Sequence, residues 1–289
     1  MVSRSGFVAL AGRPNVGKST LVNALTGSKV AIVSDKPHTT RHEIRGVYTN
    51  DEAQLVLVDL PGWQRPIDTL TERMQGRVDD AVTGDADAVL LVLNAREHIG
   101  TGDRFVARRV FGLGIPIVIV LNKVDRLKPG HVASQMKTAA ELGNFLALHP
   151  VSAKTGDGIG ELRDELIALL PEGPLYYPAD TDTDMPLEAR IAELVREQAL
   201  RLTKEEVPHA VTAEVVEIDE KRVHVRLYTE TESQKQILIG KGGTMVREIG
   251  RGARPHVEAL LGHSVFLQLQ VKASPKWRRN ETMLERLGL

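Results

Sequence analysis

The chain has no cysteine, and its 289 residues carry a formal net charge of only −1. The missing cysteines exclude disulfides, thiolate catalysis and zinc sites with cysteine ligands. No stretch approaches the roughly 20 apolar residues of a membrane span, and the first residues lack the apolar core of a signal peptide. The near-neutral charge argues against electrostatic attraction of the whole chain to nucleic acid. We therefore expect a cytoplasmic, globular protein that is long enough for two domains.

A glycine-rich motif near the start predicts phosphate binding. Residues 12–19 read Gly-Arg-Pro-Asn-Val-Gly-Lys-Ser and match the pattern G-x-x-x-x-G-K-[ST] at every fixed position. An apolar run at 7–11 precedes the motif and a helical pattern at 19–25 follows it, which is the context that a phosphate-binding loop requires. In that context backbone N–H groups and the start of the helix face the phosphates. We expect Lys18 to reach the outer phosphates and Ser19 to bind Mg²⁺. The alternative, a chance glycine turn, leaves the complete match unexplained.

A second motif predicts which base is bound. Asn122-Lys123-Val124-Asp125 follows an apolar run at 115–121. The carboxylate of Asp125 could accept hydrogen bonds from the ring N–H and the exocyclic amine of guanine, and adenine has no such pair of donors. Alone, the motif could be a polar turn, but at the carboxyl end of a parallel strand it indicates a specificity loop. Further on, 151–154 closes another strand and resembles the backbone clamp on the guanine carbonyl.

Two other segments predict a Mg²⁺ site and the sensors of the third phosphate. Asp59-Leu60-Pro61-Gly62 follows an apolar run at 55–58. We expect Asp59 to hold Mg²⁺ through water and the Gly62 N–H to contact the γ-phosphate. Thr40 lies in a polar loop where the first switch should be, and it is the third expected Mg²⁺ ligand. The order of the five elements predicts a GTPase. The residues expected to contact nucleotide are Gly12, Arg13, Pro14, Asn15, Val16, Gly17, Lys18, Ser19, Thr20, Asp59, Leu60, Pro61, Gly62, Trp63, Asn122, Lys123, Asp125, Ser152, Ala153 and Lys154.

The residue after Gly62 is Trp63, where many GTPases have a glutamine that orients the attacking water. An indole has one N–H donor and no acceptor, so it cannot orient water in that way. We expect Trp63 to pack against the switch rather than to act directly, and intrinsic turnover to be slow. Asn15 resembles the asparagine of GTPases that bind K⁺ beside the phosphates, so K⁺ is a candidate cofactor. The expected catalytic residues are therefore Lys18, Thr40, Gly62 and Asn15.

Strand and helix patterns alternate as far as residue 170. The strand candidates are 7–11, 47–49, 55–58, 88–93, 115–121 and 147–151, and helical patterns include 101–111, 131–142 and 159–170. This alternation predicts an α/β P-loop domain over 1–170 with a mostly parallel, doubly wound sheet. The runs 47–49 and 55–58 predict an antiparallel hairpin at its edge. Residues 171–186 contain four prolines, four acidic residues and no basic ones, which is typical of an extended linker.

The pattern changes class beyond the linker. Its elements are a helix at 187–202, strands at 210–218 and 222–229, a helix at 233–239, a glycine loop at 240–243, a helix at 245–261 and a strand at 264–272. This order, with Gly240-Lys241-Gly242-Gly243 between the two central helices, resembles an α+β KH domain of the bacterial type (type II) over 187–289. Such a loop has almost no side chains, so the backbone of a single-stranded nucleic acid can approach its amides.

Basic residues gather around the same loop. The segment 234–279 has nine lysines and arginines against two glutamates. A basic segment is often a solvated face, but around a G-x-x-G loop in a near-neutral chain it predicts a track for phosphates. The expected RNA contacts are Lys235, Gly240, Lys241, Gly242, Gly243, Arg247, Arg278 and Arg279.

The combination of a P-loop GTPase and a KH domain resembles the Era family of bacterial GTPases over nearly the whole chain. The resemblance rests on 12–19, 59–62, 122–125, 239–243 and Trp277, among other segments. It implies that the KH domain binds the 3′ end of 16S ribosomal RNA, that the GTP state governs this binding, and that the protein assists assembly of the small (30S) ribosomal subunit. It also implies loose, peripheral association with the inner face of the cell membrane in some members.

Two alternatives stay open from the sequence. One is an RNA-binding scaffold whose nucleotide domain is a structural switch with negligible turnover. The other is a GTPase whose partner is a protein or a membrane. A multiple-turnover assay of phosphate release, with and without RNA, tests the first, and nuclease treatment of captured partners tests the second.

Overall fold

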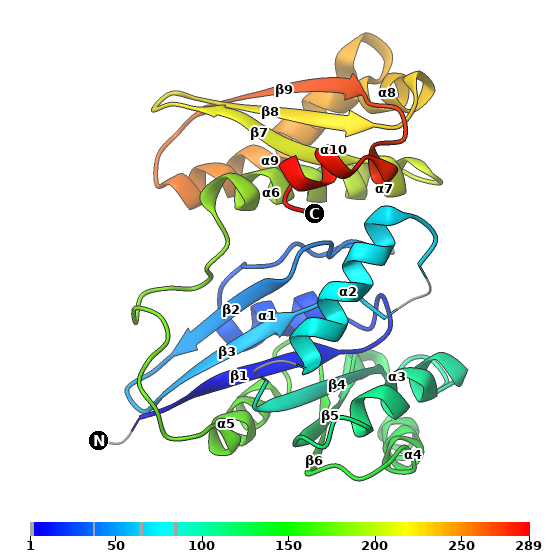
Figure 1. The fold of residues 1–289 in the computed structure, drawn as a ribbon, viewed down its shortest axis with the longest axis vertical. Helices are drawn as coiled ribbons and strands as arrows, with labels where there is room; N and C mark the ends of the chain where they lie inside the picture. The colour runs from blue at the N-terminus through cyan, green and yellow to red at the C-terminus, as the bar shows by residue number, and fades with distance from the viewer. Residues whose placement is uncertain (1–2, 37, 64–65, 84–85) are drawn as a thin grey trace. The chain divides into compact units, whose positions relative to one another are not determined.

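The computed structural model describes residues 3–36, 38–63, 66–83 and 86–289, with the side chains of 79–83 left undescribed. It divides into two compact units. The first comprises Met1–Ala31, Thr40–Pro66 and Arg73–Asp184, and the second comprises Ile32–Thr39, Ile67–Glu72 and Met185–Leu289. The elements of both units are drawn in Figure 1.

The first unit is built on a six-stranded sheet with the order β2-β3-β1-β4-β5-β6. Its strands are β1 (Arg4–Ala11), β2 (Ile44–Thr49), β3 (Ala53–Asp59), β4 (Ala88–Asn94), β5 (Ile117–Asn122) and β6 (Ala147–Val151). All neighbours pair in parallel except β2 and β3, which are antiparallel. The predicted parallel sheet with an antiparallel edge hairpin is therefore confirmed.

Helices cover both faces of this sheet (Figure 1). They are α1 (Lys18–Thr26), α2 (Thr69–Thr83), α3 (Thr101–Phe111), α4 (Pro129–Ala140) and α5 (Ile159–Leu169). Because successive strand residues point to opposite faces, Val8 of β1 joins a core with α1 and α5, and Ala9 joins a core with α2, α3 and α4. Helix α2 was not predicted, since Gly76 and several charged residues interrupt its narrow apolar stripe.

Residues 171–184, which the sequence predicted to be linker, are hydrogen-bonded to strands of the first unit. The Val47 N–H in β2 donates to the Asp182 carbonyl at 2.9 Å, and Gln54 Nε2 in β3 donates to the Tyr177 carbonyl at 2.9 Å. Near the start of the segment, Ser5 Oγ donates to the Pro174 carbonyl at 2.6 Å. The segment is thus hydrogen-bonded to β1, β2 and β3 at several points between Pro174 and Asp184.

The second unit has a three-stranded sheet with the order β7-β8-β9, in which β7 and β8 are antiparallel and β8 and β9 are parallel. Its elements are α6 (Leu187–Leu202), α7 (Val207–Ala210), β7 (Thr212–Ile218), β8 (Arg222–Thr229), α8 (Glu232–Ile239), α9 (Thr244–Leu261), β9 (Phe266–Ala273) and α10 (Glu281–Arg286). Apolar residues of α6, α8 and α9 pack against the sheet in one core. This order of elements confirms the predicted α+β KH fold, to which the short helices α7 and α10 are additions.

Contacts within the second unit explain why it includes two short stretches from earlier in the chain. The Val33 N–H donates to Glu197 Oε1 at 2.9 Å, and the buried Arg196 donates to the Thr39 carbonyl. Arg278 forms an ion pair with Asp68 at 2.6 Å. Among the described helices, none is both long enough and apolar enough to span a membrane.

Candidate nucleotide and RNA sites

The carboxyl ends of the parallel strands bring the predicted nucleotide motifs together. The P-loop follows β1, Asp59 ends β3, Asn122 ends β5, and Ser152 directly follows β6. In open α/β sheets, ligands bind at this edge. Motifs that lie far apart in the sequence therefore meet where a nucleotide can contact all of them.

Lys18 begins α1 and is almost fully buried. Its Nζ donates to the Gly12 and Arg13 carbonyls, both at 3.3 Å, so the ammonium lies within the curve of the P-loop. Burial lowers the pKa of Lys18 to about 8, and the negative charge of Asp59 opposes that change. An ammonium that has lost its water shell in this way is well suited to bind phosphate oxygens.

The expected Mg²⁺ ligands lie beside it. Asp59 is fully buried, and burial raises its pKa to about 6 against the opposing charge of Lys18. Within the described chain, neither carboxylate oxygen accepts a hydrogen bond of ordinary geometry, although the Ser19 and Thr40 hydroxyls lie close enough to lower the pKa. Those two hydroxyls are 2.9 Å apart. An unsatisfied carboxylate beside two hydroxyls is a set of hard oxygen ligands that fits Mg²⁺.

We expect Mg²⁺-dependent GTP binding to weaken as the pH falls below about 6, because protonation of Asp59 removes the charge that attracts the ion. The loss should approach about tenfold for each pH unit below that pKa. Titrations of Mg²⁺ against GTP affinity between pH 5 and pH 8 measure it. Asp59→Asn, which cannot ionise, should bind weakly at every pH. An identical pH dependence in both proteins would contradict the assignment.

The segment 60–63, where GTPases have their second switch (switch II), lies against the P-loop. A Cβ added to Gly62 would be 2.7 Å from the Pro14 nitrogen, so only a glycine allows this approach. The Gly62 carbonyl accepts a hydrogen bond from Gln75 of α2 at 3.3 Å. Trp63 is 7% exposed and belongs to the core of the first unit, with the Arg109 guanidinium 5.5 Å from its ring centroid. Its surroundings are those of a packing residue, as the sequence favoured.

The base-specificity loop is hydrogen-bonded directly to the P-loop. The buried Asn122 donates from Nδ2 to the Val16 carbonyl at 3.0 Å. Lys123 donates from Nζ to the Asn15 carbonyl at 2.6 Å, and burial lowers the pKa of Lys123. The loop expected to bind the base and the loop expected to bind the phosphates are thus held to each other by two hydrogen bonds.

The same loop is also tied to the segment after β6. The Ala153 N–H donates to Asn122 Oδ1 at 3.1 Å, and Ser152 Oγ donates to Asp125 Oδ1 at 3.1 Å. The Asp125 carboxylate is therefore held in one orientation before any base arrives, while Lys154 is exposed. The remaining predicted residues lie in the same loops or directly beside them: Gly17 and Thr20 at the start of α1, and Leu60 and Pro61 after β3.

Asp125→Asn should weaken guanine-nucleotide binding by about a hundredfold and reduce the preference for guanine over adenine. An amide presents one acceptor and one donor, whereas the guanine edge needs two acceptors. Competition of GTP and ATP against a fluorescent GDP measures the ratio. A Ser152→Ala variant, which keeps the carboxylate and removes its anchor, should lose less. If guanine still outcompetes adenine by the ratio of the unsubstituted protein, another residue recognises the base.

The glycine loop of the second unit joins α8 to α9 and has a backbone that suits glycine. Gly240, Gly242 and Gly243 all have positive φ, at 74°, 60° and 78°. Lys241 is exposed, and Arg247 Nη2 donates to the Gly242 carbonyl at 2.5 Å. This places a guanidinium directly beside the loop.

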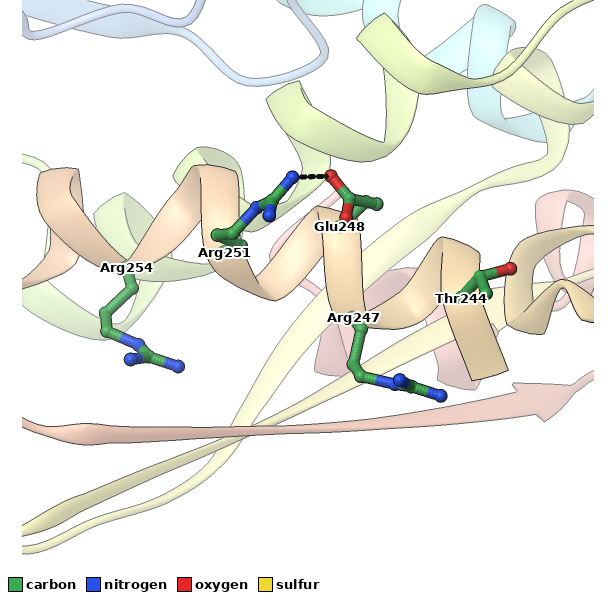
Figure 2. A pocket seen from close by; sticks show the side chains of 5 residues that line it. All are labelled: Thr244, Arg247, Glu248, Arg251 and Arg254. Carbon is green, nitrogen blue, oxygen red and sulfur yellow. Dashed lines mark hydrogen bonds and ion pairs between the residues drawn. The ribbon is translucent and has the colours of Figure 1, made fainter. Parts of the chain in front are cut away.

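Two arginines that were not among the predicted site residues extend the site along α9. A groove of about 400 Å³ is lined by Thr244, Arg247, Glu248, Arg251 and Arg254. In Figure 2, Arg247 and Arg254 extend to one side of the helix, and Arg251 and Glu248 form an ion pair on the other, at 2.5 Å. The spacing 247, 251, 254 places successive arginines one helical turn apart. This spacing in the sequence could have indicated that Arg251 and Arg254 belong to the same site as Arg247.

The other predicted RNA residues have different surroundings. Lys235 pairs with Glu232 of the same helix at 3.0 Å, and Arg279 is exposed. Arg278 is mostly buried in its ion pair with Asp68, with side chains 12% and 8% exposed. Arg278 therefore has a partner within the protein, and its contact with RNA stays a prediction.

Comparisons with known proteins agree with both units. Residues 7–123 match the family described as 50S ribosome-binding GTPase, and residues 201–278 match the KH domain family. GTPase Era of Mycobacterium bovis is 43% identical, with 98% of each chain covered. GTPase Era of Lactobacillus helveticus is also 43% identical, over 99% of this chain and 96% of the relative.

Solved structures extend the comparison to the fold. A crystal structure of Era in complex with MgGDPNP and nucleotides 1506–1542 of 16S ribosomal RNA has a TM-score of 0.95 and 35% identity, covering 99% of both chains. A substituted Era from Aquifex aeolicus bound to GDP·AlF4⁻ also has a TM-score of 0.95, with 34% identity. Identity and coverage of this extent, together with the nucleotide loops and the KH fold, show that the chain belongs to the Era family of GTPases.

Proposed function

We propose that this protein is a Mg²⁺-dependent GTPase that binds the 3′ end of 16S ribosomal RNA through its KH unit and assists maturation of the small ribosomal subunit. The observation that carries the proposal is the presence of both sites, nucleotide loops and glycine loop, in one chain whose fold matches Era bound to MgGDPNP and 16S RNA. The KH unit supplies the features that RNA binding requires.

The chemistry of the nucleotide site supports GTP over other nucleotides. Asp125 is oriented by Ser152, and its loop is bonded to the P-loop. Lys18 supplies a buried cation for the phosphates, and Asp59 with the two hydroxyls would hold Mg²⁺, which neutralises charge that develops on the phosphates during hydrolysis. Trp63 is not a water-orienting residue, so unassisted turnover should be slow.

The surface of the KH unit supports RNA as the partner. The glycine loop lets a phosphate backbone approach closely. The groove beside it is lined by three arginines and a single glutamate, which is paired with one of them. Neutralising phosphates with such side chains makes binding strongly dependent on salt. A protein partner would have no requirement for a loop with almost no side chains.

The test is binding of an RNA that corresponds to nucleotides 1506–1542, with a shuffled sequence as its control. The protein loaded with GDPNP should bind the native RNA much more tightly than the shuffled one, and loading with GDP should weaken that binding. Phosphate release under multiple turnover, with and without this RNA, tests catalysis in the same preparation. Equal affinity for both RNAs would contradict the proposed target, and no turnover would favour the scaffold alternative.

K⁺ should raise turnover several-fold relative to Na⁺, with Asn15 as the residue responsible. Asn15 lies in the P-loop with a φ of 64°, and its carbonyl accepts from Lys123. A monovalent cation at this position would stabilise negative charge in the transition state. Phosphate release in matched K⁺ and Na⁺ buffers measures the effect, and Asn15→Ala should abolish the difference. Equal rates in the two buffers would rule out this role.

The place of action that we propose is the cytoplasm, where small ribosomal subunits mature. Weak contact with the inner face of the cell membrane, implied by the family resemblance, is part of the proposal for this chain as well. Flotation with anionic vesicles, in the presence and absence of RNA, measures that contact. If the protein does not float with the vesicles, the proposed membrane contact is contradicted. The proposed RNA-binding function is not affected by that result.

A further inference from the structure

The side chain of Arg13 leaves the P-loop toward α3. Its Nε donates to Asp103 Oδ1 at 2.9 Å, and its Nη2 lies 2.6 Å from Glu97 Oε2. The Asp103 side chain is only 4% exposed, whereas that of Glu97 is 54% exposed. The Asp103 carboxylate is therefore shielded from water, whereas the Arg13 side chain is 31% exposed and its link to Glu97 is open to solvent.

Both carboxylates are fixed by their own neighbours. Asp103 lies in the first turn of α3, and its second oxygen accepts from the Gly100 N–H at 3.0 Å. Glu97 accepts from Asn94 Nδ2 at 2.5 Å, and its carbonyl accepts from Gln135 of α4 at 3.0 Å. Arg13 is thus anchored to the first turn of α3 and to the segment between β4 and α3, and both acidic side chains have further hydrogen-bond partners.

The start of α3 also has room for this side chain. A Cβ added to Gly102 would lie 2.7 Å from Arg13 Cδ. Any larger residue at 102 would therefore displace the arginine or the helix. The path of the Arg13 side chain depends on Gly102 and Asp103 together.

The backbone of Arg13 is part of the phosphate site. Its carbonyl accepts from Lys18 Nζ at 3.3 Å, and the next residue, Pro14, is in contact with Gly62 of switch II. The other side of the loop is held separately, by Asn122 at Val16 and by Lys123 at Asn15. Without the link to α3, the stretch 12–14 would lose its side-chain anchor.

We propose that Arg13 is a positioning residue that holds the P-loop and the Lys18 ammonium in place through its ion pair with the buried Asp103 carboxylate, rather than a ligand of the phosphates. Arg13 was predicted to contact nucleotide, and only its backbone would do so in this arrangement. This role rests on the proposed binding of GTP by the P-loop and adds the residue that holds the loop in its binding conformation.

The test compares Arg13→Ala, Asp103→Asn and the double variant for binding of fluorescent GDP and GTP and for steady-state hydrolysis. Asn at 103 keeps an oxygen that can accept from the Gly100 N–H, so α3 stays capped, but its amide group cannot accept from Arg13 on the other side. Both single variants should weaken GTP binding by about tenfold. In steady-state hydrolysis, both substitutions should raise the KM for GTP more than they lower kcat. Arg13→Lys should recover part of the GTP affinity.

Two outcomes separate positioning from direct contact. If the pair acts as a unit, the double variant binds GTP no more weakly than Arg13→Ala alone. If Arg13→Ala loses affinity while Asp103→Asn binds like the unsubstituted protein, or if the two losses add, the proposal is overturned. Thermal unfolding of each variant checks that the fold persists. Arg104→Ala, an exposed residue of the same helix, is the matched control and should change nothing.

The proposal and the activity on which it rests fail differently. If the unsubstituted protein did not bind GTP, the assignment of the P-loop itself would be wrong. If the unsubstituted protein binds GTP, and Arg13→Ala and Asp103→Asn bind GTP with the same affinity, the assignment of the P-loop is supported. The positioning role of Arg13 is then refuted.

Discussion

Replacing Lys18 with methionine is expected to weaken GTP binding by about a thousandfold, equivalent to about 4 kcal/mol. The side chain is buried in the curve of the P-loop and supplies the ammonium that would meet the outer phosphates. Methionine fills a similar volume without a charge, so the phosphates would be buried among amides with no cation from the loop. Titration with a fluorescent GTP analogue measures the loss. Unchanged affinity would refute the assignment of the P-loop.

The same variant has a second expected property, which serves as the control for folding. The fall in the pKa of Lys18 from 10.5 to about 8 corresponds to about 3 kcal/mol that opposes folding while the ammonium is charged. This cost is complete below pH 8 and disappears as the pH rises from there toward 10.5. Without nucleotide at pH 7, Lys18→Met should therefore unfold at no lower denaturant concentration than the unsubstituted protein. An early unfolding transition would mean that lost binding reflects lost structure.

Replacing Lys241 and Gly242 together with aspartate is expected to reduce RNA affinity by at least about a hundredfold at moderate salt. Both residues are exposed, and two new carboxylates would face phosphates where the backbone of the glycine loop must approach them most closely. GTP hydrolysis should be retained, because no residue of the nucleotide site changes. Filter binding with the 16S RNA fragment and phosphate release in its absence measure the two activities.

A matched variant guards against a general charge effect in this experiment. Lys221→Asp changes an exposed residue of the turn between β7 and β8 and makes the same kind of charge reversal away from the glycine loop. Its RNA affinity should fall only slightly. Retained RNA binding in a folded Lys241/Gly242 variant would refute the KH site, whereas an equal loss in Lys221→Asp would show that only net charge matters.

The nucleotide site could be predicted from sequence because its motifs are local. Each segment combines a strand end with a loop of fixed chemistry, and a parallel sheet must bring such ends to one edge. The contacts that connect the motifs were outside the reach of that argument. The bond from Lys123 to the Asn15 carbonyl and the ion pair of Arg13 with Asp103 join residues about a hundred positions apart, which no spacing rule relates.

The RNA site was only partly predictable, since counting charge does not reveal which charges are already paired. Arg278 was counted with the basic residues around the glycine loop, yet its partner, Asp68, lies far earlier in the chain. Arg254 was counted in the same total, and its place in the groove follows from helical spacing rather than from charge. Burial separates the two arginines, and burial is a property of the folded chain.

The composition of the second unit from three stretches of the chain has a consequence for how the protein can be divided. A fragment cut at residue 185 would contain Arg196 and Arg278, both mostly buried, but neither Thr39 nor Asp68, with which they interact. Such a fragment leaves the Arg278 guanidinium without its ion-pair partner and leaves Arg196 with Glu193 of its own helix but without the Thr39 carbonyl. The second unit is therefore not a module that genetic shuffling can transfer by a single crossover, and grafting it onto another nucleotide-binding domain requires that domain to supply both missing stretches.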